Sequence, residues 1–102
     1  MNVNELKANF NKLGIEMKIF FTLILCADAK NGAGEVNKVR IAKYLKTSPQ
    51  TVGKYLKNFV ECNMIKYKYS GRFVINPDFY YVGPTETKER AKYDYAQFKS
   101  DM

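Results

Sequence analysis

Histidine and tryptophan are absent from this 102-residue sequence, and cysteine occurs only twice. Without histidine the chain has no imidazole that could act as a general base, a metal ligand or a pH switch. Cys26 and Cys62 are too far apart for metal-ligand spacing, and two sulfurs do not complete a tetrahedral zinc site. We therefore expect no metal and no cofactor, and we expect both thiols to be buried and reduced.

Long apolar runs are also missing. The longest, Ile19 to Ala27, is interrupted by Thr22 and is far shorter than the roughly 20 residues that span a bilayer. It lies inside the sequence, so it is not a signal peptide. These absences predict a cytoplasmic protein that does not enter the membrane.

Catalytic motifs are missing as well. The sequence contains no glycine-rich phosphate loop and no nucleophile motif, and its acids Asp28, Asp78 and Asp94 show no motif pairing. We therefore predict that the protein is not an enzyme.

Negative charge is scarce in the middle of the sequence. Between Val36 and Arg72 there are nine basic residues and one acid, Glu61, which gives this segment a formal charge of +8. The rest of the chain has eight basic and nine acidic residues. Such a concentration indicates a polyanionic partner such as nucleic acid, provided that the fold gathers the cations on one surface. The nine are Lys38, Arg40, Lys43, Lys46, Lys54, Lys57, Lys66, Lys68 and Arg72.

The first third of the chain predicts two helices. A short amphipathic helix follows Asn4, and a second helix from Ile15 to Ala29 is apolar on nearly all sides. A helix of the second kind is buried on most faces. We expect it in the core, covered in part by a second subunit.

The next segment predicts a helix-turn-helix. Asn37 is a good cap for a helix from Lys38 to Lys46. Ser48 caps a second helix, which Pro49 begins and which runs to about Cys62. About three residues separate the two helices, as in a helix-turn-helix.

Alternating side chains on both sides of a glycine-containing turn then predict a β-hairpin, and a short strand at Glu35–Val36 is a further candidate. A two-residue loop would pair Tyr69 with Arg72, whereas a three-residue loop would pair Tyr69 with Phe73. We favour the longer loop because it gives the hairpin one apolar face. That face holds Ile65, Tyr67, Tyr69, Phe73 and Ile75, and the other holds Lys66, Lys68 and Val74.

The composition turns polar after Gly83. We expect residues 1–83 to form one domain and residues 84–102 a tail, with a helix from Thr85 to Phe98. Such a helix is marginal by itself, so we expect it to dock on its own domain or on a partner subunit.

Helices, helix-turn-helix and hairpin in this order resemble a winged helix-turn-helix domain, an α+β fold. The resemblance lies in IAKYLKTSPQTVGKYLKNFVECNMIKYKYSGRFVINPD, which begins at Ile41. Most such domains bind duplex DNA, with the second helix of the motif in the major groove and the hairpin, or wing, beside it. The resemblance implies that the DNA-facing residues of that helix are Ser48, Gln50, Thr51, Lys54 and Tyr55.

Two further groups of residues are predicted to bind DNA. Lys38 and Arg40 stand in the first turn of a helix, where the helix dipole disfavours positive charge. A phosphate placed there would meet both cations and free backbone amides. At the wing, Arg72 suits a narrow, A·T-rich minor groove, and we expect the wing to contribute at least as much affinity as the recognition helix. The wing residues are Lys66, Lys68, Ser70 and Arg72.

A closer resemblance lies beyond the wing. The stretch FVINPDFYYVG, residues 73–83, is similar to the same region of RepL-type plasmid replication initiators. In size, lysine content and single-domain organisation the chain looks more like the winged-helix relaxosome accessory proteins of Gram-positive conjugative plasmids. Those proteins bind double-stranded DNA at the origin of transfer and assist the relaxase.

These resemblances imply a sequence-specific, non-enzymatic DNA-binding protein of a relaxosome. We expect it to act as a homodimer at short repeated sites, with a relaxase as a further partner. The alternatives are a replication initiator, a transcriptional regulator and a protein-interaction module.

Overall fold

The computed structural model describes residues 14–28 and 31–101. The helix expected after Asn4 lies outside these residues. The architecture is the α+β fold that the sequence predicts, with the helix and strand order of a winged helix. Its elements are α2 (Ile15–Cys26), β1 (Ala33–Glu35), α3 (Lys38–Leu45), α4 (Pro49–Glu61), β2 (Ile65–Tyr67), β3 (Arg72–Ile75) and α5 (Thr85–Gln97).

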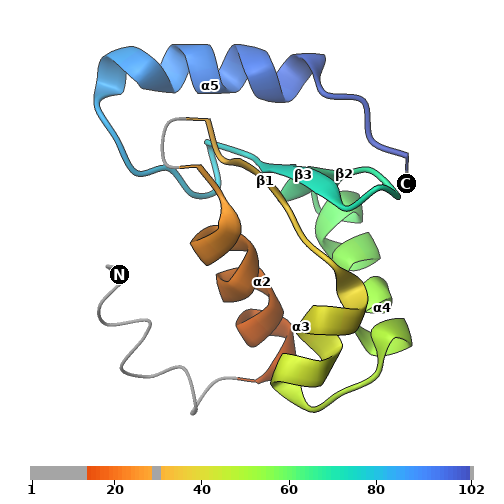
Figure 1. Cartoon of the computed structure of the whole chain (residues 1–102). Coiled ribbons are helices and arrows are strands. Elements are labelled where there is room, and N and C mark those ends of the chain that lie inside the picture. The colour runs from red at the N-terminus through yellow and green to blue at the C-terminus, as the bar shows by residue number, and fades with distance from the viewer. Residues whose placement is uncertain (1–13, 29–30, 102) are drawn as a thin grey trace.

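The sheet lies between two helical layers. Figure 1 shows α2, α3 and α4 on one side of the strands and α5 crossing on the other side. Ile65, Tyr67, Phe73 and Ile75 point from β2 and β3 into a core cluster shared with α2, α3 and α4. Val74 is buried on the opposite face, where α5 packs. Both faces of the sheet are therefore covered by helices at its centre.

The sheet has three antiparallel strands in the order β1-β3-β2, where the sequence analysis expected a two-stranded wing. The expected short strand exists, but it begins at Ala33 and pairs with β3. This leaves β2 as an edge strand.

The wing turn differs from the prediction by one residue. Tyr67 pairs with Phe73, and the Lys68 amide donates to the Arg72 carbonyl at 2.8 Å. The loop has three residues, as favoured, but the predicted pairing of Tyr69 with Phe73 is wrong. Tyr69 lies in the turn and is 70% exposed, so it is not part of the apolar face.

Gly71 explains the shift. Its φ is +99°, and a Cβ at this position would lie 2.2 Å from the Val36 carbonyl oxygen. The Val36 amide in turn donates to the Gly71 carbonyl at 2.9 Å. A glycine is therefore required where the turn closes against the segment before α3. This distant contact fixes the register.

Local capping forms the helix-turn-helix as predicted. Asn37 Oδ1 accepts hydrogen bonds from the Val39 and Arg40 amides at 2.9 and 3.2 Å. Ser48 Oγ accepts one from the Thr51 amide at 3.2 Å, with Pro49 as the first residue of α4. These caps satisfy amides that the helix itself leaves unpaired.

Helix α2 is less buried than expected. It ends at Cys26 rather than Ala29, and Leu25 is 55% exposed. Cys26 and Cys62 are both exposed, so the prediction of buried thiols is wrong. Each stands at the end of a helix, beyond the last turn that packs into the core.

The tail docks on its own chain, one of the two arrangements expected for it. The Tyr95 hydroxyl donates to Asn63 Oδ1 at 2.7 Å. Beyond α5, the Asp101 amide donates to the Tyr67 carbonyl at 2.8 Å, and Ser100 Oγ accepts from the Tyr67 amide at 3.1 Å. These bonds occupy the outer edge of β2, which would otherwise offer unpaired backbone groups to another chain.

Candidate nucleic-acid interface

The exposed face of α4 presents one row of polar side chains. Gln50, Lys54, Lys57 and Glu61 are all exposed, and their spacing of four, three and four residues places them on one side of the helix. Val52, Leu56 and Phe59 are buried on the opposite side. Gln50 and Lys54 were predicted for this face; Lys57 was not, although its helical spacing from both would have indicated it.

The other residues predicted for α4 lie at the flank of this row. The hydroxyl groups of Ser48 and Thr51 are 2.9 Å apart and hydrogen-bonded, and the Ser48 hydroxyl also caps the helix. Tyr55 is partly buried against the core cluster. Ser48, Thr51 and Tyr55 therefore already have partners within the protein.

Lys38 connects α3 to both α4 and the wing. Its Nζ is 5.5 Å from the centroid of the Tyr67 ring and 3.6 Å from the place where a Cβ of Gly53 would stand. Attraction between the ammonium and the ring face compensates for the unfavourable helix dipole at this end of α3. The side chain is thus held beside α4 rather than extended into solvent.

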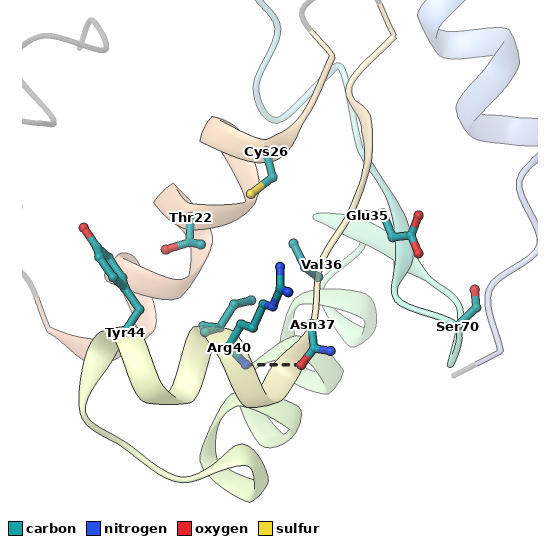
Figure 2. A pocket seen from close by; sticks show the side chains of 9 residues that line it. Thr22, Cys26, Glu35, Val36, Asn37, Arg40, Tyr44 and Ser70 are labelled. Atoms are coloured by element: carbon teal, nitrogen blue, oxygen red, sulfur yellow. Dashed lines mark hydrogen bonds between the residues drawn. The ribbon is translucent and has the colours of Figure 1, made fainter.

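Arg40 points to a different place. It lines an open cleft of about 630 Å³ between α2, α3 and β1, together with Thr22, Cys26 and Tyr44 (Figure 2). Lys38 and Arg40 do not converge on one point, because residues two apart on a helix face different sides. The Asn37 cap also occupies two of the amides that a phosphate was expected to meet.

The wing cations lie on the face of the sheet that α5 covers. Lys66 Nζ donates to the Tyr95 carbonyl at 2.8 Å and stands 4.6 Å from the centroid of the Tyr95 ring. Lys68 Nζ is 5.2 Å from the Phe98 ring centroid. Arg72 is exposed and borders a hollow of about 370 Å³ that Asp94 also lines. The nine cations of the central segment therefore do not share one surface, and the expectation that the fold gathers all of them is wrong. Lys54 and Lys57 are exposed together on α4, whereas Lys66 and Lys68 contact the α5 side of the sheet.

Direct ion pairing does not neutralise these cations in the part of the chain that the structure describes. Within residues 14–28 and 31–101, none of the nine forms an ion pair. The observed ion pairs join Arg90 to Asp94 and Lys92 to Asp78 and Glu89, around α5. The positive potential of α3, α4 and the turn between them is thus available to a polyanion.

Burial changes the pKa of the two tyrosines whose rings contact Lys38 and Lys66. Desolvation raises the pKa of Tyr67 and that of Tyr95, because it disfavours the phenolate. Both rings therefore stay neutral partners for Lys38 and Lys66 at physiological pH.

The part of the chain that the structure describes lacks two other features that would indicate a function. It contains no group of three cysteine, aspartate or glutamate residues placed to hold a metal ion. None of its helices combines the length and the apolar character needed to cross a membrane.

Comparison with known protein families shows which family the chain resembles. A family model described as Firmicute plasmid replication protein (RepL) matches residues 11–102. No curated protein and no solved structure matches. The family match includes the helix-turn-helix, the wing, the stretch after it and α5.

Proposed function

Because the chain belongs to the RepL family of Firmicute plasmid replication proteins, we propose that it binds double-stranded DNA at a plasmid replication origin. The observation that carries this proposal is the exposed row on α4, where Lys54 and Lys57 stand without an acidic partner among the described residues. A winged-helix arrangement presents this helix to the major groove.

Three residues of the row have a role in the proposal. Lys54 and Lys57 attract phosphates, which supply affinity but little sequence information. The Gln50 amide can donate to and accept from a base edge, so Gln50 supplies specificity. Lys38 adds a further phosphate contact from the start of α3.

The wing contributes beside this surface. Ser70 and Arg72 are exposed in and next to the turn, where they reach the flanking backbone or an A·T-rich minor groove. Lys66 and Lys68 act mainly in docking α5, since both already contact its side of the sheet. Arg40 reaches DNA only from the cleft beside α2.

The cellular role is proposed as replication. A relaxosome accessory role at an origin of transfer, with a relaxase as partner, is the second candidate, carried by the overall likeness in size and composition. The family match favours replication. In both roles the protein binds without catalysis, as a homodimer on repeated sites.

Binding is tested by fluorescence anisotropy with a plasmid origin duplex at several salt concentrations. The three phosphate contacts proposed for Lys38, Lys54 and Lys57 predict that log K falls with log[salt] with a slope of about −2.7. An affinity that does not change between low and moderate salt would contradict the proposal. Complete lack of binding to duplex DNA would favour a protein-interaction module instead.

A footprint on the whole plasmid distinguishes the two roles. Protection at the replication origin supports the proposal, and protection at a nick site of the transfer origin supports the relaxosome role.

A further inference from the structure

Gly53 occupies an unusual position for a glycine. It is the fifth residue of α4, in the interior of the recognition helix and partly exposed. Glycine weakens a helix interior because it loses more backbone freedom on folding than any other residue. A reason is therefore needed for a glycine here.

The fold itself does not supply that reason. Gly53 is not among the glycines with positive φ. The three atoms nearest to a Cβ added to it would be Lys38 Nζ at 3.6 Å and Lys38 Cδ and Cε at 3.9 Å, which are ordinary contacts. In contrast, a Cβ on Gly34 would lie 2.6 Å from the Cys26 carbonyl oxygen. Alanine fits the folded chain at position 53 but not at position 34.

The surroundings of Gly53 indicate what the missing side chain makes room for. Gln50 and Lys57 precede and follow it by three and four residues, so they flank it on the helix surface. Lys38 Nζ borders it from α3. The helix backbone at Gly53 is thus bordered by the ammonium groups of Lys38 and Lys57 and by the amide of Gln50. Among the described residues, none of these three groups is paired to a carboxylate.

We propose that Gly53 is the point where α4 and the sugar–phosphate backbone of duplex DNA approach most closely, with a phosphate paired to Lys38 Nζ. The Tyr67 ring holds this ammonium beside the bare backbone. From there Lys38 also borders a hollow of about 220 Å³ next to the wing turn, lined by Tyr69 and Ser70. The inference rests on the proposed DNA binding and adds to it a close-approach residue and its phosphate partner.

Gly53→Ala tests the proposal because stability and affinity should change in opposite directions. Removing a helix glycine raises the melting temperature by about 2–6 °C. The added methyl group holds the DNA backbone away, so affinity for the origin duplex falls about tenfold, a loss of about 1.4 kcal/mol. Thermal unfolding and fluorescence anisotropy measure the two effects on the same protein.

Gly14→Ala is the matched control. Gly14 precedes α2 with φ −66° and ψ 163°, which alanine also adopts, and a Cβ there would meet no atom of the described residues within 4 Å. This variant should bind DNA as the wild type does.

Lys38→Met identifies the phosphate partner. It keeps an unbranched apolar side chain of similar length and removes the ammonium, so affinity should fall and the salt slope should become shallower by about 0.9. If Gly53 and Lys38 serve the same phosphate, the double variant loses less affinity than the product of the two single losses.

The possible failures are distinguishable. If the wild type binds with a steep salt dependence and Gly53→Ala binds equally well, the close-approach inference is wrong and the proposed function stands. If Gly53→Ala lowers the melting temperature as well as the affinity, the glycine is structural and the inference is wrong. If the wild type binds no duplex, the proposed function fails before any variant is made.

Discussion

Lysines of α4 and lysines of the wing have different surroundings, although they lie close together in the sequence. Lys54 and Lys57 are exposed on α4. Lys66 and Lys68 lie between β2 and the tail, over the rings of Tyr95 and Phe98. Positive charge in the sequence therefore does not reveal which cations are available to a partner.

The difference arises from the geometry of the two elements. On α4, side chains spaced four, three and four residues apart lie on one side of the helix, and this side faces solvent because the opposite side is buried. In a strand, successive residues alternate between faces, so Lys66 and Lys68 point away from Tyr67 and the helical core. That face is the one on which α5 packs. The comparison predicts that variants of the first pair change affinity and variants of the second change stability.

The largest effect is expected from Lys54→Gln combined with Lys57→Gln. Loss of two charged hydrogen bonds to phosphate should reduce affinity about 30–100-fold and make the salt slope shallower by about 1.8. Anisotropy titrations over a range of salt concentrations measure both. Since both side chains are exposed, the free energy of unfolding should change by less than about 0.5 kcal/mol.

The second-largest effect, on stability, is expected from Lys66→Met combined with Lys68→Met. The variant loses the hydrogen bond to the Tyr95 carbonyl and two contacts between an ammonium and a ring, so stability should fall by about 1–2 kcal/mol. Urea unfolding gives the stability, and the same titration gives the affinity. A loss of affinity at least as great as that of the α4 pair would show that the wing contributes at least as much affinity as the recognition helix, as expected from the sequence.

Tyr95→Phe tests the docking of α5 without removing a charge. It deletes the hydroxyl that donates to Asn63 Oδ1 at 2.7 Å, which should cost about 1 kcal/mol. Thermal unfolding should show a melting temperature lower by about 4–8 °C. Tyr93→Phe is the control, since Tyr93 is 59% exposed and should be unaffected; an equal shift in both variants would argue against the docked arrangement.

The smallest effect is a loss of stability at high pH. Burial raises the pKa of Tyr67 and Tyr95 in the folded state, above the ordinary tyrosine value of about 10. Below that pH both states keep these protons; above it the unfolded chain releases them first, so stability falls as pH rises. Urea unfolding between about pH 8 and 11 measures this, and Tyr95→Phe should lose less stability over that range. A stability that increases above pH 10 would contradict it.

The sequence predicts the elements that depend on neighbouring residues. Asn37 and Ser48 cap their helices through hydrogen bonds from amides two or three residues away, and Pro49 begins α4. The helix-turn-helix is therefore predicted almost to the residue. The position of the wing turn depends on contact between Gly71 and Val36, which are far apart in the sequence, and it was missed by one residue.

The candidate site is predictable only in part for the same reason. Gln50 and Lys54 are exposed as their spacing indicates, and Lys57 follows from the same periodicity. The partners of Lys66 and Lys68 come from the tail about 30 residues later; Lys66 and Tyr95 are 29 apart. A polar helix with few apolar positions does not show from its own pattern which surface it covers.

The bonds that residues 100 and 101 make along β2 have a practical consequence for handling this protein. An affinity tag or fluorescent protein fused directly after Asp101 would crowd the backbone groups of Tyr67 and pull the short segment away from the strand. Neighbouring molecules in a concentrated sample could then pair through the uncovered strand, and a gel shift would report clusters rather than single complexes.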